Sequence, residues 1–247
     1  KFVLLAQNQE GYKNLLKLSS KSFLKSDLPS KPKVKIKDLY KYNTGLIALT
    51  GGPGSLLNKL ILKKDFINSK KYLENINQLF KNRLYIEIQR HSLENEKLSE
   101  SELINLAYSL NIPIVATNEP YFSDESMYLA HDALICISSG KYLDDNERVR
   151  FSSEHRFKSA EEMSLLFADL PEAIENTILI AKRCSFIVPN NEPMLPKFAT
   201  NEIEELKKQA EEGLQNRIKS MSLSDDYDVY KKRLNYELEI IESMGFP

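Results

Sequence analysis

Short apolar runs alternate with longer segments of helical periodicity along the first 185 residues. Four of the runs have the length and aliphatic composition of strands, and they span residues 2–6, 45–50, 84–88 and 112–116. Between them apolar residues recur at helical spacing, and Asn8 and Asp65 stand where they can cap two of the helices. This alternation predicts an α/β fold with a mostly parallel sheet or barrel.

The pattern changes after Gly140. Residues 141–158 are rich in charge, and Ser159 with Glu162 forms a capping box ahead of another apolar helical run. Pro171 suits the first turn of a helix that runs to about residue 184. Two amphipathic helices are expected at about 201–221 and 226–244 with no strand between them. We therefore predict two domains, residues 1–185 and residues 186–247.

Composition excludes some classes of protein. The 247 residues carry a net charge of -1, which gives no global attraction for nucleic acid, although 34 Lys and Arg leave room for a local basic surface. Cys136 and Cys184 both fall in helical patterns, which favours buried thiols in a reducing compartment, and we expect a cytoplasmic protein. No apolar run reaches membrane-spanning length, so no membrane partner is expected. The opening KFVLLAQNQE resembles a strand entered midway, so we expect an N-terminally incomplete chain.

Polar residues follow the strand at 112–116. In α/β folds the carboxyl ends of parallel strands are where functional groups gather, which places Asn118, Glu119 and Tyr121 at a candidate rim site. His91 follows the strand at 84–88 and is a second rim candidate. Such oxygen and imidazole groups suit divalent metals. His131 lies on a helix among apolar neighbours, and for it a hydrogen-bonded core histidine is favoured over a ligand.

Each of two further motifs has two competing interpretations. The turn TGGPGS (residues 50–55) could hold an anion on backbone N–H groups, but a tight turn with close packing is favoured because the Walker pattern is absent. Arg148, Arg150, His155 and Arg156 could bind phosphate or acidic groups of a partner, or form a solvated loop, and the sequence leaves both readings open.

Several segments together resemble a known family. They read LLAQNQEGYKNLLKLSS (4–20), GLIALTGG (45–52), LYIEIQRH (84–91), IPIVATNEPYF (112–122), AHDALICI (130–137), SAEEMSLLFADLPEAIENTILIAKRC (159–184) and YKKRLNYELEIIESMGF (230–246). In order and spacing these resemble the alpha subunits of bacterial DNA polymerase III, the C-family replicative polymerases.

The resemblance implies a fold and a role. Residues 1 to about 185 are similar to most of the polymerase-and-histidinol-phosphatase (PHP) domain, a distorted β/α barrel, here incomplete at its N-terminus. Residues from 186 are similar to the start of the polymerase palm, and a mostly helical segment is expected there. The family's catalytic aspartates would lie beyond Pro247, so no polymerase catalytic residue and no cofactor are expected here. The full chain would make DNA from dNTPs with Mg²⁺, alongside a proofreading exonuclease, a sliding clamp and other holoenzyme subunits.

The family's metal-binding positions can be compared one by one. Where active PHP domains carry ligands, this chain has Lys1, Gly52 and Tyr121, and only Glu119 remains a plausible ligand. The resemblance therefore implies a degenerate metal site in a domain that serves structure and docking of the exonuclease. The alternative is a metal-dependent PHP phosphoesterase or exonuclease.

Overall fold

The computed structural model describes residues 2–24, 32–190, 192, 194–221 and 227–246. They form two compact units, residues 1–188 and 189–247. Lys1, one of the metal-site candidates, lies outside the described residues. The assignment of residues 1–185 to a PHP domain and of 186–247 to the palm stays a prediction.

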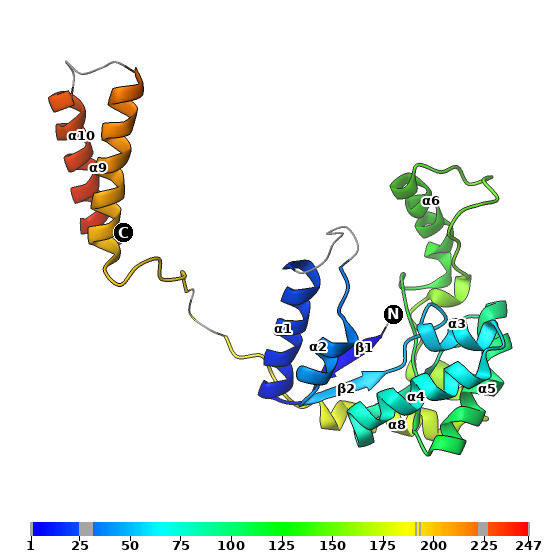
Figure 1. Cartoon of the computed structure of the whole chain (residues 1–247). Helices are drawn as coiled ribbons and strands as arrows, with labels where there is room; N and C mark the ends of the chain where they lie inside the picture. Colours follow the sequence, from blue (N-terminus) through cyan, green and yellow to red (C-terminus); the bar gives the residue numbers. More distant parts are fainter. Residues whose placement is uncertain (1, 25–31, 191, 193, 222–226, 247) are drawn as a thin grey trace. The chain divides into compact units, whose positions relative to one another are not determined.

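A four-stranded sheet organises the first unit (Figure 1). Its strands are β1 (Val3–Ala6), β2 (Leu46–Leu49), β3 (Leu84–Ile88) and β4 (Ile114–Ala116), in that spatial order. The pairs β2–β3 and β3–β4 are parallel, whereas β1 runs antiparallel to β2. The predicted α/β fold with a mostly parallel sheet is confirmed, and the open sheet is consistent with an incomplete PHP barrel.

Helices connect and cover these strands. Those of the first unit are α1 (Gln9–Leu24), α2 (Ile36–Lys41), α3 (Leu56–Leu62), α4 (Phe66–Phe80), α5 (Glu94–Leu110), α6 (Tyr128–Ser139), α7 (Ala160–Leu166) and α8 (Pro171–Arg183), with 3-10 turns η1 (Lys81–Arg83), η2 (Glu125–Met127) and η3 (Ser153–His155). The predicted caps are present: Asp65 accepts from the Asn68 N–H, and Ser159 forms its capping box with Glu162. Pro171 is the first residue of α8.

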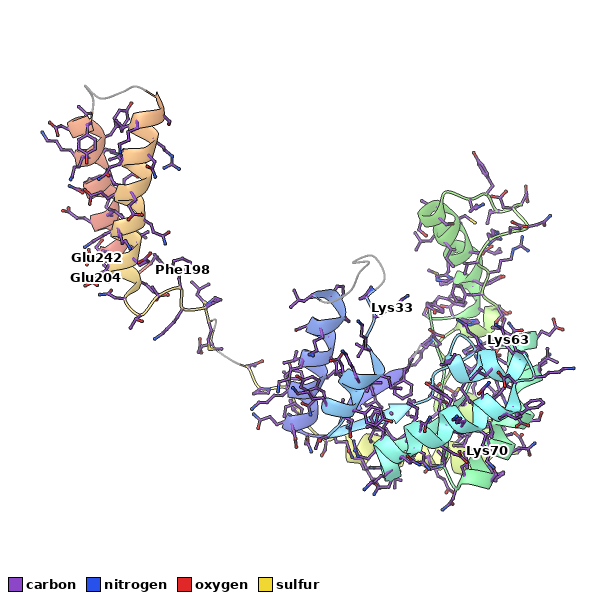
Figure 2. The ribbon with its side chains drawn as sticks, viewed as in Figure 1. Lys33, Lys63, Lys70, Phe198, Glu204 and Glu242 are labelled. Atoms are coloured by element: carbon purple, nitrogen blue, oxygen red, sulfur yellow. The ribbon has the colours of Figure 1, made fainter. Side chains whose placement is uncertain are left out.

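Apolar side chains fill both faces of the sheet. On one face Leu46, Ala48 and Ile86 pack with residues of α3, α4 and α5, and on the other Ile47 and Tyr85 pack with α8. Burial on both faces explains why the parallel strands read as continuous apolar runs and not as alternating ones. The outer helix surfaces carry charged side chains such as Lys63 and Lys70 (Figure 2).

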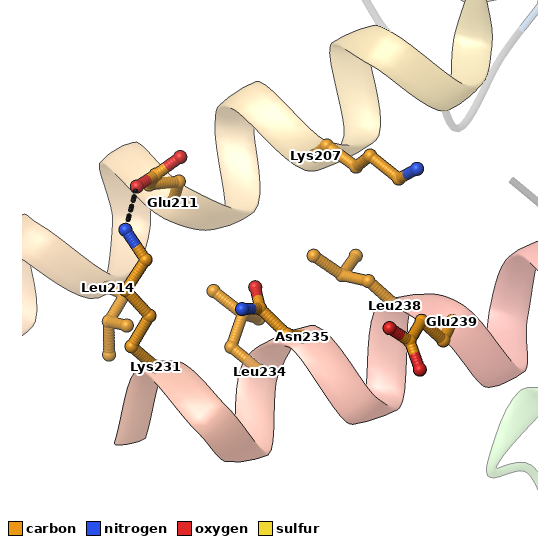
Figure 3. Close-up of a pocket in the computed structure, with 8 residues that line it drawn as sticks. All are labelled: Lys207, Glu211, Leu214, Lys231, Leu234, Asn235, Leu238 and Glu239. Carbon is orange, nitrogen blue, oxygen red and sulfur yellow. Dashed lines mark hydrogen bonds and ion pairs between the residues drawn. The ribbon is translucent and has the colours of Figure 1, made fainter. Parts of the chain in front are cut away.

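The second unit is a helical hairpin of α9 (Glu202–Met221) and α10 (Tyr227–Ser243). A groove of about 310 Å³ runs between the helices, with Leu214, Leu234 and Leu238 among its lining residues (Figure 3). Lys231 crosses it to Glu211 at 2.8 Å. This agrees with the expected mostly helical segment. Among the described residues, no helix is both long and apolar enough to cross a membrane.

Candidate functional site

The register of the sheet brings the ends of β3 and β4 together. Ile88 is paired with Ala116 in the parallel ladder, so the residues that follow each strand emerge at the same edge. The turn after β2 lies beside them, because β2 is also parallel to β3. We call this edge the rim. It unites His91 with Asn118, Glu119 and Tyr121, as the sequence predicted from strand ends alone.

A polar cluster under the rim centres on Glu87. Its Oε1 accepts hydrogen bonds from the Thr117 hydroxyl at 2.5 Å and from the Gln89 amide nitrogen at 3.2 Å. Gln89 also donates to Thr117 Oγ1 at 3.2 Å. The carboxylate therefore points into the sheet edge and contacts two side chains that sequence reasoning had not selected.

Burial raises the pKa of Glu87, and the neighbouring Glu119 adds to the rise. Hydrogen bonds from Thr117, Gly51 and Gln89 oppose it only in part. No hydrogen-bond partner within the described residues reaches Glu87 Oε2 or Gln89 Oε1. Both atoms are buried oxygens, so they enrich this pocket in acceptors.

Gly52 borders the same pocket. A Cβ atom placed on it would lie 2.0 Å from Gln89 Oε1 and 2.7 Å from Gln89 Cδ, closer than such atoms can approach. The amide of Gln89 therefore occupies the space that a side chain at position 52 would need. A side chain at this position would require the Gln89 amide to move.

His91 is almost fully buried, and both of its ring nitrogens face protein groups. Nδ1 lies 2.8 Å from Glu96 Oε1, and the same carboxylate accepts the His91 backbone N–H at 2.6 Å. Nε2 lies 3.0 Å from Asn118 Oδ1 and accepts the Glu119 backbone N–H at 3.3 Å. Because a carboxylate only accepts, Nδ1 is the donor toward Glu96. His91 thereby ties the β3 end to the β4 end.

A second histidine completes the rim. The His155 ring stacks on His91 with 4.0 Å between centroids, and Ser152 donates to its Nδ1 at 3.2 Å. Burial is the main cause that lowers the pKa of His155 from 6.5 to about 4, and the proximity of His91 is the second. His155 is therefore neutral at physiological pH and acts as a packing group.

Tyr121 stands over this stack. Its hydroxyl donates to Glu119 Oε1 at 2.9 Å, and its ring lies 4.4 Å from Phe151. Burial and the Glu119 carboxylate raise the pKa of Tyr121 to about 12. The phenol is consequently protonated at neutral pH, and it donates to the carboxylate that sequence analysis left as a plausible ligand.

His131 reaches the same aromatic group from α6. Its ring lies 5.4 Å from the Tyr121 ring and 5.3 Å from the Phe122 ring. His131 is half-buried and packs against these rings, and its buried Nδ1 has no hydrogen-bond partner within the described residues.

The three candidate arginines each contact a protein oxygen. Arg148 holds Asp132 with two bonds of 2.5 and 2.7 Å, and Arg156 pairs with Glu162 at 2.8 Å. Arg150 is exposed and donates to the Asp145 carbonyl at 3.2 Å. Of the three, Arg150 is the most accessible to an anion.

Hydrogen bonds from the buried side chain of Asn58 hold the TGGPGS turn. Asn58 donates to the Gly52 carbonyl at 3.2 Å and to Ser55 Oγ at 3.0 Å, and accepts from Ser99 on α5. Ser55 caps α3, and Gly51 adopts a φ of +84°, which favours glycine. These contacts agree with the tight-turn reading.

The residues at the rim do not fit a divalent metal. Position 52 has no side chain, the Tyr121 phenol is protonated, and protein groups face both nitrogens of His91. Among the residues that the structure describes, no three His, Cys, Asp or Glu side chains converge as a metal site requires.

Some rim residues had a signal in the sequence that went unused. Gln89 directly follows the strand that holds Glu87 and is two residues from it, so the two side chains point to the same face. Thr117 directly follows β4. The sequence contained a weaker indication that His155 belongs to the rim, because His155 follows His91 by 64 residues and the two meet only when the chain folds back to the sheet.

Comparisons with known proteins agree with the resemblance seen in the sequence. The PHP domain family matches residues 1–91. A protein of Caulobacter vibrioides named DNA polymerase III subunit alpha is 45% identical over 249 residues, which cover 99% of this chain. Proteins of the same name from Rickettsia bellii and Pseudomonas aeruginosa are 41% and 36% identical, each over 99% of this chain. The chain spans 22% of the length of these relatives.

Proposed function

Since this chain is similar along 99% of its length to alpha subunits of bacterial DNA polymerase III, we propose that it is one segment of such a subunit. That similarity is the single observation that carries the proposal. In this proposal residues 1–185 form the PHP domain and residues 186–247 begin the palm. The whole protein synthesises DNA on a template in the cytoplasm, from dNTPs and with Mg²⁺.

The role proposed for the PHP domain is structural. Its rim joins β3, β4 and the 151–157 segment through side chains, such as His91 with Glu96 and Tyr121 with Glu119. These contacts use groups that a metal site would need for coordination. The domain then serves as a docking platform for the proofreading exonuclease, with the sliding clamp and other holoenzyme subunits binding the complete protein.

A metal-dependent phosphoesterase is the second candidate. The gathering of Glu87, His91, Glu119 and His155 at one sheet edge favours it, because such edges carry the sites of many α/β enzymes. The position of Gln89 against Gly52 speaks against it.

Primer extension tests the polymerase assignment. The complete gene product should extend a primed template in a reaction that needs all four dNTPs and Mg²⁺. The 247-residue chain alone should give only background, because in this proposal the catalytic aspartates belong to other parts of the subunit. A complete gene product with no dNTP-dependent extension would contradict the assignment.

The docking role has a separate test. Isothermal titration of the chain with the proofreading exonuclease of the same organism should give a defined stoichiometry. Arg150→Glu, an exposed change near the rim, reports whether that face contributes, with Lys70→Glu on α4 as the matched control. Failure of the exonuclease to bind either the chain or the complete protein would contradict docking.

A further inference from the structure

Lysine is concentrated in one stretch of the chain. Residues 11–43 contain nine lysines and two acidic residues, whereas the whole chain has 34 basic and 35 acidic residues. The charge of the molecule is therefore unevenly distributed, with a strongly positive segment in a chain of nearly zero net charge. Local fields of this kind attract anions even when the net charge does not.

The fold brings three of these lysines together, two from α1 and one from α2. The amines of Lys17 and Lys21 on α1 and of Lys41 on α2 lie 5.6, 5.2 and 5.5 Å from the centroid of a single ring, that of Tyr42. Charges this close lie within the ~10 Å Debye length at moderate salt, so their fields add. Lys13 precedes Lys17 by four residues on the same helix and lies on the same face.

Two acidic side chains among the described residues lie on these helices, Glu10 in the first turn of α1 and Asp38 on α2. Asp38 pairs with Lys21 at 2.7 Å. The remaining lysines of the cluster, Lys13, Lys17, Lys33, Lys35, Lys37 and Lys41, are all exposed. Lys33 can be seen beside the two helices in Figure 2. Six solvent-facing amines thus outnumber the acids available to neutralise them.

Two exposed aromatic side chains lie on the same two helices. Tyr40 on α2 and Phe23 on α1 are each 57% exposed, and neither is needed in the core. Nucleic-acid-binding surfaces combine lysines, which contact phosphates, with exposed rings, on which bases can stack.

We propose that the surface formed by Lys13, Lys17, Lys33, Lys35, Lys37 and Lys41, here the α1–α2 basic surface, binds the phosphodiester backbone of DNA. The naming of DNA as the polyanion rests on the proposed function. The contact is independent of sequence, because lysines on phosphates position a nucleic acid without reading its bases. Its role is to hold DNA near the enzyme at a place separate from the rim.

Fluorescence anisotropy of labelled DNA tests the proposal with the 247-residue chain. Single-stranded and duplex 30-mers of several sequences are titrated at salt concentrations from 50 to 200 mM. Lys17→Ala/Lys41→Ala should weaken binding by roughly tenfold per lysine at 50 mM salt, equally for all sequences. The slope of log K against log salt should fall by about 1.4 for single strands and by about 1.8 for duplex, and the affinities of the wild-type chain for the two forms identify the preferred one.

A matched control separates this surface from general charge. Lys63→Ala/Lys70→Ala removes two exposed lysines elsewhere in the same unit and should leave the affinity and the salt slope unchanged. Lys33→Ala/Lys37→Ala provides a second test that leaves the Tyr42 contacts intact. Circular dichroism melting verifies that each variant is folded.

Three results would overturn the proposal. One is equal loss of DNA affinity in the Lys63→Ala/Lys70→Ala control, and another is no loss in either α1–α2 variant. The third is binding of polyglutamate, or of vesicles with anionic lipid, more tightly than DNA of equal charge, which would identify an acidic protein or a membrane as the partner. Because primer extension is measured on the complete gene product, a failure here is distinguishable from failure of the polymerase assignment.

Discussion

Gly52 and Gln89 show how one residue shapes the candidate site. The Gln89 side chain is 8% exposed and has little room to move away from a new methyl group at position 52. Gly52→Ala should therefore destabilise the first unit by roughly 1–3 kcal/mol, the usual cost of overpacking. Chemical denaturation of the variant measures this change.

Gln89→Ala supplies the control for that prediction. With the amide gone, Gly52→Ala should cost much less in the Gln89→Ala background than in the wild type. The two positions must then show a coupling energy, which a double-mutant cycle reports. Additive effects would show that Gln89 does not occupy the space at position 52.

His155 predicts a pH dependence of stability. Its pKa is about 4 in the folded protein and 6.5 ordinarily, so between these values the unfolded chain binds more protons. The free energy of unfolding therefore falls as the pH drops from 6.5 toward 4, and this contribution is intact above 6.5. His155→Phe keeps a ring against His91 but cannot titrate. Relative to the wild type, the free energy of unfolding of this variant should rise by up to ~3 kcal/mol as the pH falls from 6.5 to 4.

Unfolding curves of both proteins at pH 4.5, 5.5, 6.5 and 7.5 check this. An unchanged difference between variant and wild type across these values would mean that His155 is not held neutral by the fold.

Residue-level chemistry was only partly readable from the sequence. Asn118 and Glu119 were placed at the rim because a strand ends just before them. The stack of His155 on His91 was not predicted, since it depends on how the 151–157 segment returns to the sheet. Hydrogen bonds such as Tyr121 N–H to the His155 carbonyl at 2.8 Å fix that return, and periodicity carries no information about them.

At the scale of elements, α6 depends on an ion pair. Figure 1 shows α6 projecting from the body of the first unit, and Leu134 and Ile137 on it are exposed. Asp132 on this helix is held by Arg148 from the following loop, and both side chains are at most 10% exposed. Arg148 holds the pKa of Asp132 below its usual range through this hydrogen bond.

Arg148→Ala should loosen α6 and its loop. The change leaves the Asp132 carboxylate without its charged donor. Hydrogen exchange of the α6 amides should accelerate by about 10- to 100-fold, while β2 and β3 stay protected. Arg150→Ala, on an exposed neighbour, is the control. Equal protection of α6 in the two variants would contradict the prediction.

Elements themselves were the most predictable level. All four strands and the caps at Asp65 and Ser159 follow from apolar runs and short-range hydrogen bonding, and they appear within about two residues of the expected positions. The antiparallel pairing of β1 with β2 did not follow from the sequence. Strand order depends on long-range packing, which local patterns do not encode.

At the scale of the whole molecule, the two compact units predict independent folding. The buried core residues of the first unit lie between Leu18 and Ile180, so that unit supplies its own core. A chain ending at Val188 should melt cooperatively, with its midpoint within about 4 °C of the corresponding transition in the 247-residue chain. Loss of cooperative melting on shortening would contradict this division.

The side chains of the rim contact one another, and we predict that the rim does not form a hydrolytic metal site. The most direct measurement is the metal content of the dialysed complete gene product by mass spectrometry, with 3′-exonuclease and pyrophosphatase assays in Mn²⁺ and Zn²⁺. We predict less than stoichiometric metal at the rim and no metal-dependent hydrolysis. Stoichiometric metal together with hydrolysis that disappears in Glu119→Ala would contradict the claim and favour the phosphoesterase.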